Sequence, residues 1–251
     1  MLPRVSTTGT PDVLWLSVNP NFRRLEQPLL VQLTEHHTVS HWSYCQTPDE
    51  PCSLDIALTL LHDSLKAYDR ALHIIGHGTG GVLGILYARQ FPRRVKSLTL
   101  LGVGANPAVD WKAHYYTQLE QLSCSRSCVL TQMVHSLFGK QCNHCLQGLR
   151  ELLERDLMES LSLHSLAKRF SLFPGNVPVP LLVCGGQEDA IVDSVQLQSW
   201  QPWLKDGDRL WLCPDGRHFF HATHPARSSE QILDFWHQVE STASFPACLE
   251  S

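Results

Sequence analysis

The sequence places two residues with acid–base chemistry in separate loops near its C-terminal end. Asp189 lies in Gly186-Gln187-Glu188-Asp189-Ala190-Ile191-Val192, and His218 follows Pro214-Asp215-Gly216-Arg217. An imidazole can act as a base when a buried carboxylate holds its other nitrogen and stabilises the imidazolium ion. Each loop follows an apolar run typical of a strand, and parallel strands end at the same edge of a sheet. We therefore predict an Asp189–His218 dyad; a turn residue and a loop histidine are the plainer interpretation.

Earlier in the chain, a glycine-rich turn lies between a predicted strand and a predicted helix. Its residues are Gly76-His77-Gly78-Thr79-Gly80, after the apolar run 71–75. In the pattern Gly-x-Ser-x-Gly, the central serine of such a turn attacks an acyl carbon. The central residue here is Gly78, so no acyl-enzyme can form on its side chain. Thr79 has a hydroxyl, but we expect it to cap the helix, because attack also requires placement beside the base.

The turn, the acid segment and the histidine segment, in this order, resemble the α/β-hydrolase superfamily (AB hydrolase-1 type) over roughly residues 13–239. The resemblance implies that His218 is the base, that Asp189 orients it, and that Gly78 occupies the position of the nucleophilic serine. Glu188 and Asp193 are weaker candidates for the acid.

The same resemblance implies a binding surface around the turn. The Thr79 amide can donate to an oxyanion, and His77 can either line the pocket or pack beside the sheet. Asn19 lies in the loop after the first predicted strand, where many relatives have an oxyanion donor. In that loop Pro20 has no amide hydrogen to donate. We therefore predict binding roles for Thr79, His77 and Asn19.

Three hypotheses fit these residues. The first is a non-hydrolytic pseudoenzyme that binds a small apolar molecule or a protein partner, since Gly78 and Pro20 are two departures from one mechanism. The second is an enzyme that uses His218 and Asp189 without a covalent step, as a lyase, a cofactor-free oxygenase or a water-activating hydrolase. The third is a serine esterase-type hydrolase whose serine was lost by divergence or engineering. None of the three requires a cofactor.

Composition limits the class of partner. The chain has 251 residues, of which 43% are hydrophobic, so it can bury one sizeable core. Twenty basic and twenty-four acidic side chains give a net charge of −4 without a basic run, which argues against nucleic acid. No apolar run approaches the roughly 20 residues needed to span a bilayer. We predict a cytoplasmic protein without a membrane partner, whose nine cysteines are reduced thiols.

The order of apolar runs and amphipathic segments predicts an α/β fold. Strands expected at 13–18, 38–42, 71–75, 95–101, 179–186 and 208–213 alternate with helical patterns, which indicates a mainly parallel sheet of about six strands flanked by helices. One such helix, after an N-cap at Ser53, is expected to bury Ile56, Leu60, Leu61 and Leu65. We predict a core of residues 1–105 and 178–251 and a helical cap insertion at 106–177, with a loose tail from Ser241.

Two patterns suggest metal ligands, although no metal is predicted. The spacing Cys124-x3-Cys128 and Cys142-x2-Cys145 is near that of zinc ligands, and a structural zinc stays open as an alternative to buried thiols. His218, His221 and His224 are spaced by three residues, but no carboxylate or cysteine completes a shell. Trp111, Tyr115 and Tyr116 can line an apolar pocket under the insertion, or pack in the core.

Overall fold

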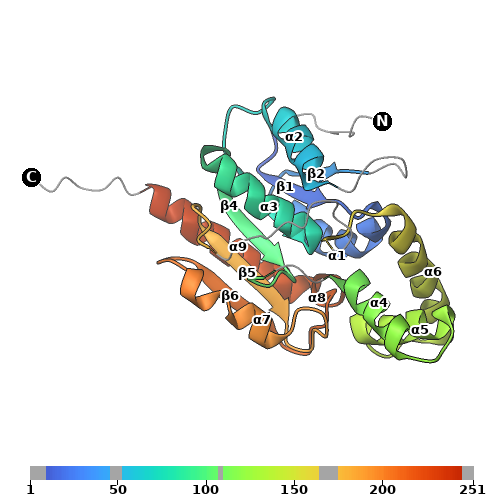
Figure 1. The fold of residues 1–251 in the computed structure, drawn as a ribbon. Coiled ribbons are helices and arrows are strands. Elements are labelled where there is room, and N and C mark those ends of the chain that lie inside the picture. The colour runs from blue at the N-terminus through green and yellow to red at the C-terminus, as the bar shows by residue number, and fades with distance from the viewer. Residues whose placement is uncertain (1–9, 46–52, 107–109, 164–174, 245–251) are drawn as a thin grey trace, which may run out of the picture.

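The computed structural model describes residues 10–45, 53–106, 110–163 and 175–244, and six strands within them form one parallel sheet (Figure 1). The strands are β1 (Val13–Ser17), β2 (Val39–Ser43), β3 (Leu72–His77), β4 (Val95–Leu101), β5 (Leu181–Gly186) and β6 (Arg209–Cys213). The helices are α1 (Arg23–Thr34), α2 (Leu54–Leu65), α3 (Thr79–Gln90), α4 (Trp111–Gln121), α5 (Arg126–Phe138), α6 (Asn143–Glu159), α7 (Ser194–Gln198), α8 (Phe220–Thr223) and α9 (Pro225–Ser244), with 3-10 turns η1 (Pro20–Phe22), η2 (Pro92–Arg94) and η4 (Gln201–Trp203). The predicted fold class is confirmed.

Side chains of β1 alternate between the two faces of the sheet. Leu14 and Leu16 belong to the larger apolar cluster, which includes residues of α2 and α3. Val13 and Trp15 belong to a second cluster with residues of α1 and α9. Because successive strand residues point to opposite faces, a strand buried on both faces has a continuous apolar sequence. Helices accordingly cover both faces of the sheet (Figure 1).

The strand order is β2-β1-β3-β4-β5-β6, so the order reverses between β1 and β3. The chain passes from β1 to β2 on one side and then returns to pair β3 with the other side of β1. In open parallel sheets, ligands bind beyond the carboxyl ends of the strands at such a reversal. The loop that begins at Val18 and the turn at Gly78 both follow strands that end there.

Glycines allow α3 to start against the backbone of the sheet. A Cβ on Gly80 would lie 2.4 Å from the carbonyl oxygen of Leu16, and a Cβ on Gly81 would lie 2.7 Å from Cγ2 of Val103. Further along the helix, a Cβ on Gly84 would lie 2.8 Å from a side-chain carbon of Leu98 on β4. Only glycine fits these contacts without movement, so the first turn of α3 is fixed close to the sheet.

Three helices, α4, α5 and α6, lie between β4 and β5 in the chain and stand beyond the carboxyl ends of the strands (Figure 1). Side chains of Asp110 and Ser125 cap α4 and α5, where each accepts a backbone N–H of the first turn. The described part of the insertion predicted at 106–177 therefore contains these three helices. Residues 107–109 and 164–174 of it lie outside the described residues, and the division into core and cap insertion stays a prediction.

Some predicted details are wrong. The Ser53 hydroxyl accepts the Asp55 N–H at 3.2 Å, as an N-cap should, but Ile56 is 39% exposed. The buried face of α2 consists of Leu54, Ala57, Leu61 and Leu65. The closing helix α9 continues to Ser244, so the chain after Ser241 is helical where a loose tail was expected.

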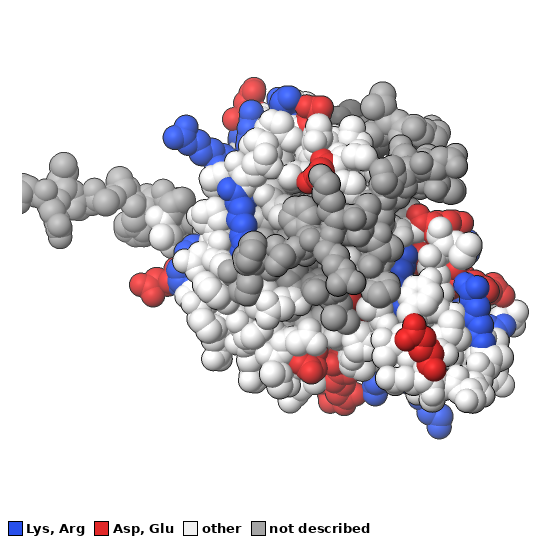
Figure 2. Space-filling view, in the orientation of Figure 1, with Lys and Arg blue, Asp and Glu red and all other residues white. Residues whose placement is uncertain are grey.

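The surface of the described residues gives no sign of a membrane-spanning helix. Every helix that the structure describes is too short or too polar to cross a bilayer. On the face drawn in Figure 2, Lys and Arg side chains are interspersed with Asp and Glu.

Candidate active site

Asp189 and His218 are buried and in contact. Nδ1 of His218 lies 2.9 Å from Oδ2 of Asp189, so the ring N–H donates to the carboxylate. Oδ1 of Asp189 accepts the backbone N–H groups of Ile191 at 2.8 Å and Val192 at 3.1 Å. Three hydrogen bonds therefore hold the carboxylate, which in turn orients the imidazole and leaves its Nε2 for the pocket. The geometry is that of the predicted dyad, and its chemical role stays a prediction.

Backbone contacts join the two loops that carry this pair. The Gln187 N–H donates to the Cys213 carbonyl at 3.0 Å, and the Glu188 N–H donates to the Gly216 carbonyl at 2.8 Å. A Cβ on Gly186 would lie 2.3 Å from that same Gly216 oxygen. The loops after β5 and β6 are thus in direct backbone contact, which places the acid beside the histidine although they are distant in sequence.

Gly78 forms the turn between β3 and α3 with φ 50° and ψ −122°. Such a positive φ favours glycine over residues with a side chain. The Gly78 N–H donates to the Leu101 carbonyl at 3.0 Å, and its own carbonyl accepts the Val82 N–H at 3.1 Å. No described atom lies within 4 Å of a Cβ built on Gly78. The backbone of the turn is fixed, while the direction that a side chain would take is open.

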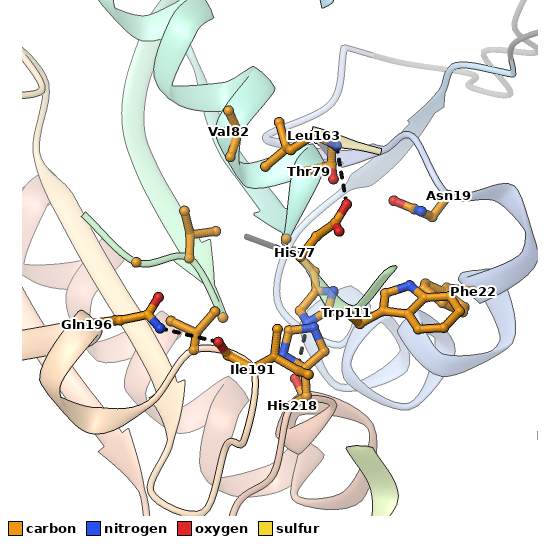
Figure 3. A pocket seen from close by; sticks show the side chains of 16 residues that line it. Asn19, Phe22, His77, Thr79, Val82, Trp111, Leu163, Ile191, Gln196 and His218 are labelled. Atoms are coloured by element: carbon orange, nitrogen blue, oxygen red, sulfur yellow. Dashed lines mark hydrogen bonds between the residues drawn. The ribbon is translucent and has the colours of Figure 1, made fainter. Parts of the chain in front are cut away.

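Gly78 and His218 line the same pocket, whose volume is about 550 Å³ including its mouth. Its apolar lining consists of Phe22, Val82, Val103, Trp111, Leu163, Ile191 and Val192, and its polar lining consists of Asn19, His77, Thr79, Asp110, Gln196 and His218, with Gly78, Gly102 and Gly104 between them. In Figure 3, His77 and His218 lie together, with Phe22 and Trp111 on one side of them and Gln196 on the other. The mainly apolar lining suits a small, largely apolar ligand.

A buried carboxylate of α6 holds Asn19 at the pocket wall. The Asn19 amide donates to both oxygens of Asp156, at 3.3 and 3.4 Å, and the Trp111 indole N–H donates to Oδ2 at 3.1 Å. Nζ of Lys112 lies 3.7 Å from the same oxygen. Burial raises the pKa of Asp156, and the charge of Lys112 opposes that shift. This network ties two pocket residues to a helix from the segment between β4 and β5.

The carboxylate of Asp110 is used for structure, although it reaches the pocket. Its Oδ1 accepts the Ala113 N–H at 3.0 Å and caps α4. Its Oδ2 accepts the Ser162 hydroxyl at 2.5 Å and the Leu163 N–H at 3.2 Å. Asp110 therefore holds Leu163 over the pocket, as the dashed line at Leu163 in Figure 3 shows.

Three histidines cluster under the pocket. Nε2–H of His77 donates to the backbone carbonyl of His218 at 3.1 Å, and the His77 ring centroid lies 4.6 Å from that of His221. Burial lowers the pKa of His77 well below its ordinary value, and His221 and His218 lower it further. Burial also lowers the pKa of His221 to about 3. Both rings are neutral near pH 7, and His77 both lines the pocket and supports the His218 loop.

The structure brings the predicted site residues together. Asn19, His77, Gly78, Thr79 and His218 all line the pocket, and Asp189 lies behind His218. Of the aromatic candidates, Trp111 lines the pocket, Tyr115 is buried elsewhere, and Tyr116 is largely exposed.

The other candidates for the acid have different contacts. Glu188 forms an ion pair with Arg217 at 3.0 Å, and Asp193 caps α7 by accepting the Gln196 N–H at 2.8 Å. Sequence reasoning missed Asp110 and Gln196 as pocket residues. An aspartate before a helical pattern is an N-cap signal that could have marked Asp110; Gln196 had no such signal.

The described residues include no group of three or more His, Cys, Asp or Glu side chains placed to hold a metal ion. His221 is buried beside His77, whereas His224 contacts the Thr223 hydroxyl, at 2.9 Å. Cys124, Cys128, Cys142 and Cys145 are free thiols. The alternative of a zinc site formed by these four cysteines finds no support in this arrangement.

No family model matches the chain. It is 43% identical over 228 residues to "Uncharacterized protein sll0249" of Synechocystis sp. (strain ATCC 27184 / PCC 6803 / Kazusa), a match that covers 91% of each chain. It is 41% identical over 225 residues to "Uncharacterized protein alr2406" of Nostoc sp. (strain PCC 7120 / SAG 25.82 / UTEX 2576), with 90% of each chain covered. A more distant relative, 24% identical, with 86% of this chain and 87% of the relative covered, is "Putative carbamate hydrolase RutD" of Variovorax paradoxus (strain S110).

Solved structures with a similar fold include hydrolases and esterases. A serine hydrolase of carbazole degradation, the CarC enzyme, superposes with a TM-score of 0.68 at 19% identity, covering 93% of each chain. Naproxen esterase (carboxylesterase NP) of Bacillus subtilis superposes with a TM-score of 0.69 at 15% identity, covering 92% of this chain and 86% of the esterase. At these identities the comparison establishes the fold alone.

Proposed function

We propose that this chain binds a small, largely apolar molecule without forming an acyl-enzyme. The chain belongs to the family of the Synechocystis and Nostoc proteins, and it has the α/β-hydrolase fold. The observation that carries the proposal is Gly78. It lies at the strand-to-helix turn, faces the pocket, and has no atom that could attack a substrate. In this proposal Gly78 stands where hydrolases of this fold have their nucleophilic serine.

The lining of the pocket supports a neutral ligand with a hydrogen-bonding group. Among the described lining residues, the one aliphatic hydroxyl belongs to Thr79, and none is Ser, Cys, Lys or Arg. Asp110 is the one carboxylate that lines it there, and both its oxygens already accept hydrogen bonds. Apolar side chains would supply most of the binding free energy, and Nε2 of His218 would accept or donate one hydrogen bond.

A second candidate function, base catalysis without a covalent step, is favoured by the Asp189–His218 contact. A histidine whose Nδ1 is held by a carboxylate is oriented to take a proton at Nε2. A pocket that only binds has less need of this arrangement. The proton would come from a carbon acid or from a water beside the ligand. A protein partner at this site, and the cytoplasmic location expected from composition, remain proposals without a further supporting observation.

The binding proposal can be tested with a phenyl alkyl ketone, in which a methylene replaces the ester oxygen. Titration calorimetry should show saturable binding to the wild-type protein and a loss of at least about tenfold in affinity for Val82→Phe, which fills the pocket. Val31→Phe is the matched control, because Val31 is 54% exposed on α1. Circular dichroism would verify that both variants are folded. No binding to the wild-type protein, or equal loss in both variants, would contradict the proposal.

The same ketone separates the two candidate functions. In D2O, a base at Nε2 would remove a proton from the carbon beside the carbonyl, and deuterium would return to that carbon. Nuclear magnetic resonance of the ketone should show no exchange above that of His218→Ala if the protein only binds. Exchange that disappears in His218→Ala and falls in Asp189→Asn would instead favour base catalysis.

A further inference from the structure

A pair of cysteines starts helix α6, apart from the pocket. The sequence there is Cys142-Asn143-His144-Cys145, and both thiols are free and exposed. Neither cysteine is among the pocket-lining residues. The spacing of two intervening residues is that of dithiols which exchange with disulfides, provided that the two sulfurs lie on the same side of one helical turn.

The helix start provides this arrangement. Cys142 is the N-cap, with an extended backbone at φ −68° and ψ 158°, and Cys145 lies three residues later in the first turn. Sγ of Cys142 accepts the backbone N–H of Cys145 at 3.4 Å. The Cys142 sulfur is therefore folded back over the residue that carries the second thiol, as disulfide formation requires.

The surroundings also favour a thiolate at Cys142. The neighbouring Cys145 thiol and its backbone N–H lower the pKa of Cys142. The Cys142 thiol, in turn, raises the pKa of Cys145. Helix α6 has 17 residues, and the partial positive charge at its N-terminus stabilises an anion at the cap. The first cysteine is thus the better attacking group and the second is the resolving group.

We propose that Cys142 and Cys145 form a reversible dithiol–disulfide site that exchanges with small or protein disulfides. The Cys142 thiolate attacks one sulfur of the disulfide R–S–S–R, which releases R–S⁻ and leaves a mixed disulfide on Cys142. Cys145 loses its proton and attacks Sγ of Cys142, which releases the second R–S⁻. Two protein thiols are oxidised to one disulfide, and R–S–S–R is reduced to two R–SH, which take up the two protons.

A second cysteine pair in the same part of the chain also has its two thiols in contact, but its backbone N–H is not donated to a sulfur. Cys124 precedes the cap of α5, and the N–H of Cys128 is taken by the Ser125 hydroxyl at 3.3 Å. Burial raises the pKa of Cys124, and the neighbouring Cys128 thiol raises it further. The two pairs lie at the starts of different helices, and α5, with 13 residues, is about 20 Å long. This pair is the internal control.

The experiment equilibrates the full-length protein with a series of reduced and oxidised glutathione mixtures in the presence of a chelator. Remaining thiols are alkylated with iodoacetamide, and disulfides are located by peptide mass spectrometry. We expect a single bridge, between Cys142 and Cys145, that is lost in Cys142→Ser and in Cys145→Ser and unchanged in the double variant Cys124→Ser/Cys128→Ser. Serine is itself a good N-cap, so the first variant removes the thiol and keeps the helix start.

Three results would overturn the proposal. In the first, Cys142 and Cys145 are both still free thiols, and are therefore alkylated, at the most oxidising mixture. In the second, the bridge joins other cysteines. The third is that the Cys124–Cys128 pair is oxidised at a more reducing mixture than the Cys142–Cys145 pair. Each result can be obtained whatever the pocket binds, so this test and the ketone titration fail independently.

Discussion

The turn after β3 and the loops after β5 and β6 reach the same edge of the sheet, yet they differ in what they carry. At the turn, backbone hydrogen bonds fix Gly78, and the position that faces the pocket has no side chain. In the loops, the Asp189 carboxylate and the His218 imidazole are both present and in contact. The comparison teaches that backbone geometry and polar side chains are separable: the fold fixes the turn at Gly78 without a side chain there, and it holds an acid and a histidine in contact in the loops after β5 and β6.

The conformation of Gly78 explains why glycine suits this turn. A residue with a Cβ at φ 50° and ψ −122° stores strain that glycine avoids. The absence of a side chain at this point costs no packing, because no described atom lies within 4 Å of the Cβ position. At His218 the opposite holds, since the ring is buried and hydrogen-bonded.

The largest expected effect comes from Gly78→Ser, which supplies the missing group. Hydrolysis of p-nitrophenyl butyrate should rise by as much as about 10⁶-fold over the wild-type protein, because the loss of a catalytic serine costs a factor of that order. The rise should vanish when His218→Ala is added. Release of nitrophenol, followed by absorbance, measures both. An inert Gly78→Ser protein would mean that the edge of the sheet lacks more than the attacking atom, and would weaken the hypothesis of a diverged or engineered serine hydrolase.

Asp189→Asn should reveal how far the acid orients the base. In the Gly78→Ser background, we expect kcat to fall by about 10⁴-fold, as when a triad aspartate is made neutral. In the wild-type background, affinity for the ketone should stay the same. Glu188→Gln is the matched control, because that carboxylate pairs with Arg217 at the surface. Equal effects of the two substitutions on kcat would contradict the assignment of the acid.

Gly78→Ala isolates the strain at the turn. It should lower the free energy of unfolding by about 1–3 kcal/mol, which is the usual cost of such a backbone conformation. Gly148→Ala is a useful counterpart: Gly148 lies inside α6, its Cβ position is equally free of contacts, and its φ is not positive. That change should stabilise the protein by about 0.5–1 kcal/mol. Urea unfolding measures both changes. A change in the free energy of unfolding of the same sign in the two variants would argue against strain at Gly78.

A further effect, on the pH dependence of stability, concerns His221, which the proposed site does not use. Neither of its ring nitrogens has a hydrogen-bond partner among the described residues, and burial lowers its pKa to about 3. In the unfolded chain the His221 imidazole takes up a proton near pH 6.5, whereas in the native protein it stays neutral. The free energy of unfolding therefore falls as the pH drops from 6.5 towards 3. The loss is about 1.4 kcal/mol per pH unit.

His221→Phe should remove this loss and keep the aromatic packing against Trp15 and Phe220. The difference between the two proteins in unfolding free energy, measured in urea at pH 7.5 and 5.5, gives the contribution of His221 together with its effect on the pKa of His77. An identical pH dependence in both proteins would show that His221 titrates in the native state.

Much of the fold was predictable from the sequence because local signals agreed with the final packing. Strand β4 (Val95–Leu101) has the predicted bounds, since a strand pattern that lies between a proline and glycines leaves little choice. The predicted inward face of α2 was wrong at Ile56. Several rotations of an apolar helix about its axis bury similar apolar area, and the neighbouring elements decide between them.

The site was predictable where its residues follow strands, and not where distant contacts make it. Asp189 and His218 could be paired because parallel strands end at one edge. The contact of Asn19 with Asp156 joins residues 137 positions apart, and nothing near Asp156 marks that residue as a partner. Sequence reasoning likewise could not indicate that Asp110 would hold Leu163 over the pocket.

The most direct test of the central claim is the intact mass of the protein after incubation with an alkyl fluorophosphonate, which phosphonylates activated serines. We expect an unchanged mass for the wild-type protein, because Gly78 has no side chain that could attack phosphorus. Gly78→Ser should gain the mass of one adduct, and Gly78→Ser/His218→Ala should gain none. The claim that the attacking group is missing would be contradicted if the wild-type protein gained one adduct and the His218→Ala variant gained none.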